Sequence, residues 1–487
     1  MIKIKSKQTI YFLGLYVLIV MIVIMTFITI PIGDFQRDNP FVILTFLVNG
    51  AVWFALLLGE VSRHAYSLLM MHWLFCLLFF FYAPVVQYAH NQFPWISVRS
   101  DEVLLTANFL LFCWTIALLA GSRIRISNRR ISSHRANESS AFFKPWDNIE
   151  KMVPILTLLN LLILSFRLVT VGPQNLLARA TSGMDLGDNS SLNLLLGHTM
   201  QAISYFAATI SILSWKKNSH SVYHSLLAVA NALFLIVAYF PTGLSRYAMA
   251  AVYGGVLLTF SNRLKRGRIF MQLFLAAFLI VLPFLNAFRN TAFSDVNIFQ
   301  SLQNIITNLG DVWLAGDYDA YTLLTMVIDY VQTDGVTWGY QLLGVLLFWV
   351  PRRFWPTKPV GSGHMVATAK GWSFTNLSCP LPAEMYINFG LAGIFLLGFF
   401  IGKALTKLDN KYWGSVDRTG NHPRYIDPLY HCLVFFCFFV SRGDLLSSTA
   451  YVVAYIAIWI VIVMPSVSMR SQKENARKNR SFHEKSI

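Results

Sequence analysis

Charged residues are scarce in this chain of 487 residues. They make up 13% of it, whereas hydrophobic residues make up 55%. In a typical soluble protein about a quarter of the residues are charged. A soluble fold of this length has no interior large enough to cover so much apolar surface. The composition therefore excludes a soluble globular protein and predicts a chain whose main solvent is lipid.

Cysteines and cofactor-binding motifs are also few. Only Cys379, one of five cysteines, lies in a long polar loop, and no CxxC spacing occurs, so disulfides and zinc sites are not expected. The sequence has no GxxxxGKS or GxxxxGKT phosphate loop, no GxSxG elbow and no HExxH pair. Asp317 and Asp319 form an Asp-x-Asp pair without a third carboxylate nearby in sequence. We expect no metal and no cofactor.

Long apolar runs, in contrast, are abundant. About 20 residues of helix cross a bilayer, and about twelve runs approach that length. They lie at roughly residues 11–32, 41–59, 67–88, 103–121, 152–172, 194–214, 222–240, 246–261, 269–287, 384–404, 428–441 and 447–467. The first run exceeds the length of a signal-peptide core and lacks a cleavage site, so we interpret it as a span. The pattern predicts an all-α polytopic membrane protein with about 12 transmembrane helices.

The positive charge is distributed in strips between these runs. The formal net charge is +16, which in a soluble protein would suggest a nucleic-acid partner. If the N-terminus is cytoplasmic, every strip that alternation places inside the cell is basic, as the positive-inside rule requires. These strips include Lys216 and Lys217, Lys403 and Lys407, and the tail at residues 470–487. We therefore predict two cytoplasmic termini, no nucleic-acid partner, and a polar tail after Met469 without fixed structure.

One long segment stays on the outer side. Residues 1–469 form a single transmembrane domain, and within it residues 288–383 make a large extracytoplasmic loop. Residues 298–331 have an amphipathic helical pattern, and the apolar stretch 338–350 is too short to span, which is typical of re-entrant or interfacial segments. Irregular backbone at membrane depth requires a cover of protein or a water-filled cavity. This loop is predicted to roof a cavity that opens to the outer face.

The loop carries three cations, although the positive-inside rule disfavours cations on the outer side. Arg352, Arg353 and Lys358 lie within seven residues that contain Pro356 and are flanked by Pro351 and Pro359. Arginine binds phosphate with two parallel hydrogen bonds, and lysine adds a point charge. The cluster favours binding of an external anion. Contacts with lipid headgroups or with a local carboxylate are the alternative.

Other arginines lie near the same face. Arg246 stands where a short turn enters the run at 246–261, and a helix N-terminus there favours an anionic ligand that both could hold. Snorkelling to the interface is the alternative. Arg289 follows the run at 269–287 and is a further candidate for the same anion. Arg167 and Arg179 could extend the positive patch.

Glu384 is the candidate catalytic residue. It opens the run at 384–404, where a carboxylate can act as a general base, form a salt bridge or cap the helix. Tyr386 and Asn388 could bind sugar hydroxyls or simply pack between helices. His364 could bind phosphate or shuttle a proton, although a loop histidine more often does neither.

Several polar residues favour structural roles. Arg442 and Asp444 stand on either side of one glycine in a short turn, and we expect them to pair with each other. His72, His198 and His431 lie on apolar runs and are expected to be core residues with satisfied hydrogen bonds.

Three segments together resemble a known family. The turn at 243–246 reads Gly-x-x-Arg, residues 351–359 read Pro-Arg-x-x-Trp-Pro-x-Lys-Pro, and residues 382–393 read Pro-x-Glu-x-Tyr-x-Asn-Phe-Gly-x-x-Gly. These motifs resemble those of the Wzy-type polymerases of O-antigen and other oligosaccharide repeat units. The motifs and the loop around them cover about a fifth of the chain, and the hydropathy layout is similar throughout.

The resemblance implies a metal-independent glycosyltransferase with a GT-C-like architecture in the bacterial inner membrane. Such enzymes transfer a glycan from an undecaprenyl diphosphate carrier to the non-reducing end of another repeat unit at the outer face. The substrate would be the undecaprenyl diphosphate-linked oligosaccharide, and a Wzz-type co-polymerase would regulate chain length. Arg246, Arg289, Arg352 and Arg353 would neutralise the diphosphate leaving group, Glu384 would be the base, and Lys358 and His364 would be supporting contacts.

Two other functions compete with this one. An O-antigen ligase, which passes a finished glycan to another acceptor, has a similar layout but a stronger histidine motif than His364 provides. A non-enzymatic flippase of lipid-linked sugars would carry polar residues through both leaflets, whereas the charges of this chain gather at the outer end.

Overall fold

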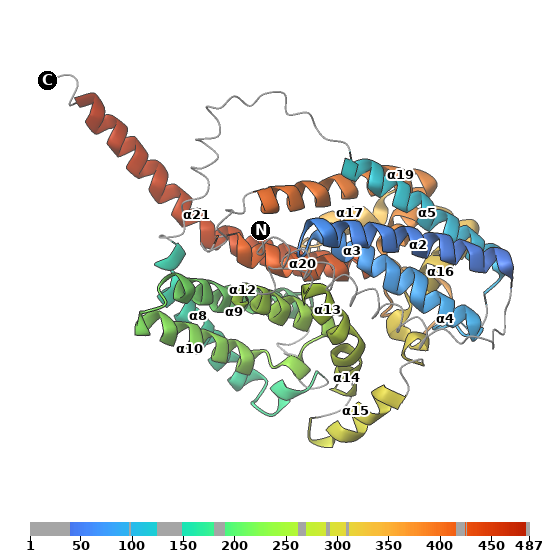
Figure 1. The fold of residues 1–487 in the computed structure, drawn as a ribbon, viewed down its shortest axis with the longest axis horizontal. Coiled ribbons are helices and arrows are strands. Elements are labelled where there is room, and N and C mark those ends of the chain that lie inside the picture. Colours follow the sequence, from blue (N-terminus) through green and yellow to red (C-terminus); the bar gives the residue numbers. More distant parts are fainter. Residues whose placement is uncertain are drawn as a thin grey trace, which may run out of the picture.

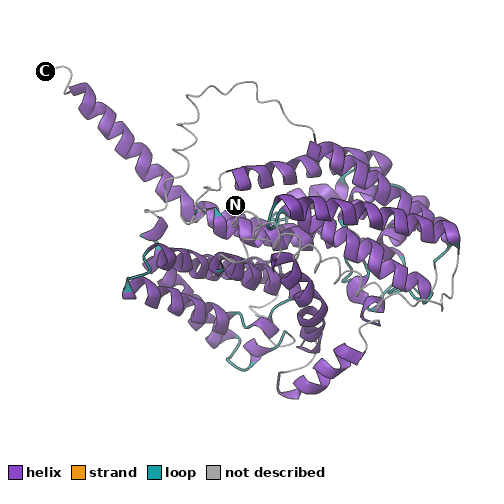
Figure 2. Cartoon of the chain, in the orientation of Figure 1, coloured by secondary structure: helices purple, strands orange, loops and turns teal. Residues whose placement is uncertain are grey.

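The computed structural model describes residues 39–96, 99–123, 149–179, 190–261, 269–288, 293–307, 311–414, 424 and 426–483. Within these residues every element longer than an isolated bridge is helical, as Figure 2 shows. The apolar run at 11–32, Arg289 and most of the basic strips near 124–148 and 262–268 lie outside the described residues.

Six helices of the described part are long and apolar enough to cross a membrane. They are α2 (Pro40–Arg63), the run Leu68–Ala89, α5 (Asp101–Arg123), α8 (Val153–Thr170), α19 (Leu381–Gly414) and the Leu445–Met464 part of α21 (Leu445–His483). They confirm an all-α membrane protein. The full number of twelve spans stays a prediction.

The other expected runs in the described part are helical too, but several are short or interrupted. They form α9 (Ser190–Lys217), α10 (Val222–Ala238), α11 (Arg246–Met249), α12 (Gly255–Phe260), α13 (Ile269–Ala276), α14 (Leu282–Phe284) and α20 (Asp427–Arg442). Three of the runs contain a π-helical turn, in which one extra residue widens the helix. These turns are η1 (Leu78–Tyr82), between α3 (Leu68–Leu77) and α4 (Ala83–Ala89), η4 (Ala250–Gly254) and η5 (Ala277–Val281).

The helices form two groups with a shared centre. In Figure 1, α2, α3, α5 and α19 lie on one side and α8, α9, α10 and α12 on the other. Helix α20 packs against α3 of the first group and α12 of the second, and α21 packs against α9 and α20. The turn between α20 and α21 is therefore central in the molecule.

Helices α5 and α19 approach each other closely. A Cβ atom at Gly402 would lie 2.1 Å from the carbonyl oxygen of Leu118, and one at Gly121 would overlap the carbonyl of Phe399. Small residues at such spacing let backbones approach within a membrane, where packing drives helix association. This contact fixes the part of α19 after Gly390, whereas Glu384 lies in the first turn of the helix.

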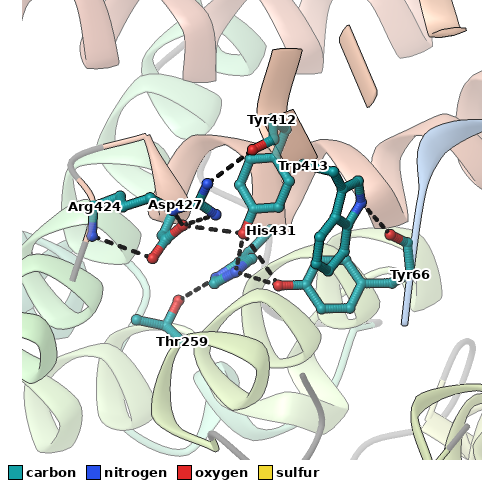
Figure 3. Close-up of polar contacts among 7 residues, drawn as sticks. All are labelled: Tyr66, Thr259, Tyr412, Trp413, Arg424, Asp427 and His431. Carbon is teal, nitrogen blue, oxygen red and sulfur yellow. Dashed lines mark hydrogen bonds and ion pairs between the residues drawn. The ribbon is translucent and has the colours of Figure 1, made fainter. Parts of the chain in front are cut away.

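A buried hydrogen-bonded cluster holds the first turns of α20 (Figure 3). Nε2 of His431 lies 3.0 Å from the hydroxyl of Tyr66 and 3.2 Å from that of Tyr412. Nδ1 lies 2.8 Å from Oγ1 of Thr259, which donates its own hydrogen to the Gly255 carbonyl and so accepts from Nδ1. The expectation that His431 is a satisfied core residue is confirmed.

The same cluster contains a buried ion pair. Arg424 donates to Asp427 at 2.7 Å and its guanidinium lies 4.1 Å from the ring centre of Tyr412. The Tyr412 hydroxyl donates to Asp427 at 3.0 Å. These contacts join the C-terminal end of α19 to the N-terminal end of α20. The α20–α21 turn lies at the other end of α20. A second core histidine, His72, bonds to Ser441 at 3.0 Å near that turn.

The long loop folds into short helices. They are α15 (Ile298–Thr307), η8 (Asp311–Leu314), η9 (Gly316–Tyr318), α16 (Ala320–Asp334), α17 (Tyr340–Leu346) and α18 (Ser362–Ala369). Residues 320–328 of α16 are all buried, so α16 forms the centre of the loop rather than lying on a surface. Helix α17 has seven residues and is too short to span, as the sequence predicts.

The expectation that the tail after Met469 lacks fixed structure is wrong, because α21 continues to His483. The tail contains arginine, lysine, glutamate, glutamine and alanine, which are strong helix formers. Adding them to an existing helix avoids the cost of nucleation.

Candidate functional site

A polar cavity of about 520 Å³ lies at the α20–α21 turn. Its walls come from segments far apart in sequence: the connection after α4, the turn before α11, η9, residues 352–378, and the α20–α21 turn. The long loop thus covers one side of the cavity and membrane helices form the other.

Four of the arginines in the described part line this cavity: Arg179, Arg246, Arg352 and Arg442. Arg246 and Arg352 were both predicted from sequence to bind an anion, and the fold brings these two predicted residues to one cavity. Arg167, in contrast, is buried away from it, with its guanidinium 4.6 Å from the ring centre of Tyr239.

Two of these arginines are paired with carboxylates that also line the cavity. Arg246 forms an ion pair with Asp317, and Arg442 forms one with Asp319 at 2.8 Å. Arginine has five N–H donors in a rigid plane, so one carboxylate does not use them all. The carboxylates fix the direction of each guanidinium.

The expected pair between Arg442 and Asp444 is wrong. Gly443 has a φ of +72°, and at this bend the chain directs the two side chains to different partners. Asp444 accepts a hydrogen bond from the backbone N–H of Ser447 at 3.0 Å and thereby caps α21. Arg442 instead reaches Asp319, a residue more than a hundred positions away in sequence.

The other cations of the loop have different surroundings. Arg352 donates to the carbonyl of Lys358 at 2.7 Å, and Lys358 donates to the carbonyls of Phe348 and Val350 at 2.5 and 3.1 Å. Burial, and then the charge of Arg352, lowers the pKa of Lys358. Lys358 thus holds the loop in shape and does not line the cavity, and Arg353 is exposed outside it.

Glu384 lies behind the cavity wall rather than on it. Its side chain is 1% exposed, and its two oxygens accept from the Ser362 hydroxyl at 2.6 Å and from the Leu445 N–H at 3.0 Å. Asp444 binds the same first turn of α21 but does line the cavity. Burial raises the pKa of Asp444, and the nearby His364 opposes that shift. His364 also lines the cavity.

The motif at 382–393 proves to be a kinked helix. Gly390 has a φ of +60°, a conformation that favours glycine, and Phe389 also leaves the helical region. The side-chain oxygen of Asn388 accepts from the Leu342 N–H at 3.2 Å, which ties the kink to α17. Asn388 and the half-buried Tyr386 do not line the cavity, so the motif supports the wall.

An apolar groove of about 260 Å³ adjoins the polar cavity. Residues of η4, α12, α13, η5 and α20 line it, and Arg246 and Tyr247 line both the groove and the cavity. The two π turns, η4 and η5, lie on its walls, and π turns are frequent at functional sites. The two spaces together suit a ligand with a lipid part and an anionic part.

The sequence did not predict that Trp95 lines the cavity or that Asp444 faces it. No signal near Trp95 in the sequence indicates such a role.

Within the described residues no group of three or more His, Cys, Asp or Glu side chains is placed to hold a metal ion. Comparison of the chain with family models, curated proteins and solved structures found no match.

Proposed function

We propose that this protein is a metal-independent polymerase of lipid-linked oligosaccharide repeat units. It would transfer the glycan of an undecaprenyl diphosphate carrier to the non-reducing end of a second repeat unit at the outer face of the inner membrane. The observation that supports this most is the junction at Arg246 and Tyr247, where the arginine-lined cavity meets the apolar groove. A polyprenyl diphosphate joins an anionic group to a long apolar chain. Its diphosphate would suit the cavity, and its polyprenyl chain would suit the adjoining groove.

The arginines account for departure of the leaving group. When the bond between the anomeric carbon and the diphosphate oxygen breaks, its electron pair leaves with the diphosphate. Guanidinium groups that are already oriented stabilise this charge without reorganising during the reaction. Arg246 and Arg442 are oriented by Asp317 and Asp319, and Arg352 by the Lys358 carbonyl.

The proton of the acceptor hydroxyl goes to Asp444 in this proposal. A general base must come within about 3 Å of the proton that it removes. Asp444 faces the cavity, whereas both oxygens of Glu384 are occupied behind it. The hydroxyl oxygen attacks the anomeric carbon as its proton passes to Asp444. Glu384, predicted from sequence to be the base, would hold the first turn of α21 and so position Asp444.

The test is incubation of the purified chain, in lipid nanodiscs, with a lipid-linked repeat unit and without metal or nucleotide. The wild-type protein should give a ladder of glycan lengths. Arg246→Ala should reduce the rate about 100-fold or more, the usual effect of removing one charge-stabilising donor. Lys370→Ala, which removes a cation of the same loop outside the cavity, should leave the ladder unchanged.

Absence of any ladder from the wild-type protein would contradict the proposal. Transfer of a complete glycan in one step to a different acceptor would favour the ligase instead, since both reactions use a lipid diphosphate donor.

A second cavity supports the alternative that the protein is a flippase. This smaller cavity of about 190 Å³ lies at the other end of α19 and is lined by Glu60, Arg63 and Asp409. The core between the two cavities is closed at His72 and Trp114, which are fully buried and hydrogen-bonded to each other at 3.1 Å. Movement of a lipid-linked glycan across proteoliposomes, without polymer formation, would identify a flippase.

A further inference from the structure

Trp95 is an unusual residue in the wall of the polar cavity. It lies in the connection between α4 and α5 and has a φ of +67°, which is uncommon for a residue with a bulky side chain. Strained backbone of this kind persists where the surroundings hold it and is concentrated at ligand sites. The side chain is 43% exposed, although it lines a cavity.

Two contacts hold the indole in this position. Its Nε1 donates to Oδ2 of Asp319 at 3.1 Å, the carboxylate that also pairs with Arg442. Gly316 lies so close to the indole that an added Cβ atom would be 2.4 Å from Cζ2. The hydrogen bond to Asp319 and the close backbone of Gly316 therefore hold the indole in place on one side, without a bound ligand.

A second aromatic ring extends this surface. Phe374 comes from the loop before α19, lines the same cavity and is also 43% exposed. Its ring centre is 5.3 Å from that of Trp95, with 33° between the ring planes. Two large apolar side chains thus face a space whose other walls carry arginines and carboxylates.

Trp95 and Phe374 differ from the other exposed tryptophan and phenylalanine side chains of the described residues, which do not line this cavity. Trp338, for example, is 81% exposed and also has a positive φ of 52°, but it does not line the cavity. Exposed apolar surface in a polar, water-accessible space is unfavourable by about 25 cal/mol per Å². A ligand with one apolar face and several polar edges would remove that surface from water while keeping its own hydroxyl groups bonded.

We infer that Trp95 and Phe374 form a stacking platform for a pyranose ring. The C–H face of a sugar would cover the two rings, and its hydroxyl groups would meet Asp317, a carboxylate that lines the same cavity and is less buried than Asp319. The platform is a glycan site separate from the arginines. It rests on the proposed function only in assigning the bound ring to the acceptor glycan.

The test uses a soluble probe, so that it does not depend on the lipid or on turnover. The probe is the oligosaccharide released by mild acid from the lipid-linked glycans of the cells that express the chain. Its binding to the full chain in nanodiscs is measured by saturation-transfer NMR and titration. Trp95→Ala should weaken binding about tenfold, the effect of losing one aromatic contact. Trp95→Phe should retain most of the affinity.

Trp338→Ala is the matched control, because it removes an exposed tryptophan of positive φ outside the cavity. Any of three results would overturn the inference. Trp95→Ala could bind the probe as well as the wild-type protein does, both alanine variants could lose the same affinity, or the wild-type protein could fail to bind the probe. Failure of the polymerase proposal has a different signature: the probe binds in a manner that depends on Trp95, but no glycan ladder forms from the lipid-linked substrate.

Discussion

Replacing Arg442 by methionine is expected to destabilise the protein by about 3 kcal/mol, near the lower end of the range for breaking a buried ion pair. The side chains of Arg442 and Asp319 are 14% and 2% exposed. Without the guanidinium, Asp319 would keep only its bonds from the Ser378 hydroxyl at 2.7 Å and the Trp95 indole at 3.1 Å. Two neutral donors do not compensate a buried carboxylate fully, because hydrogen bonds from charged groups are about twice as strong.

The assay is unfolding of the full chain in mixed detergent micelles with increasing dodecyl sulfate, and it includes Asp319→Asn and the double variant. The double variant should lose less stability than the sum of the two single variants, because each single change leaves a buried polar group without its partner. Arg63→Met is the control, since that side chain is 72% exposed and its pair with Glu60 should contribute under about 1 kcal/mol. Equal effects of Arg442→Met and Arg63→Met, or strict additivity in the cycle, would refute the reasoning.

Two further predictions concern the proposed base and the kinked helix. Polymerase activity should fall with decreasing pH through a value above the ordinary pKa of an aspartate, because burial raises the pKa of Asp444 and only its unprotonated form accepts a proton. His364→Ala should move this acidic limb to higher pH in the rate profile, since it removes a nearby positive charge; an unchanged limb would contradict the assignment. Gly390→Ala should cost about 1–3 kcal/mol in the unfolding assay, because a φ of +60° with a ψ of −144° favours glycine, and an unchanged stability would contradict this reasoning.

Much of the helical layout could be predicted from hydropathy alone. The run expected at 428–441 corresponds to α20 at Asp427–Arg442, and that at 222–240 to α10 at Val222–Ala238. Apolar runs mark these helices because every backbone polar group in lipid must be bonded within the segment. Hydropathy does not register the π turns, because an added apolar residue leaves the run equally apolar.

The site was predictable only in part, because local sequence does not tell which distant residues become neighbours. The chemistry of Arg246 and Arg352 led us to predict that both bind an anion; both line the cavity, and anion binding stays a prediction. Arg442 had a carboxylate two residues away and was assigned to it, yet a distant one in η9–α16 bonds it instead. Glu384 stands at a helix start, as expected, but its sequence position does not say whether that turn faces a cavity or a packed wall.

The π turn at η4 makes the connection between groove and cavity depend on the number of residues in one helix. Each residue advances an α-helix by about 100° around its axis. Deleting Ala250 would restore regular winding and rotate Arg246 by about that angle relative to α12. The run would stay equally hydrophobic and would still insert, but the arginine would no longer stand between the two spaces. In this protein, a length change that a hydropathy plot cannot detect would therefore separate the arginine-lined cavity from the apolar groove.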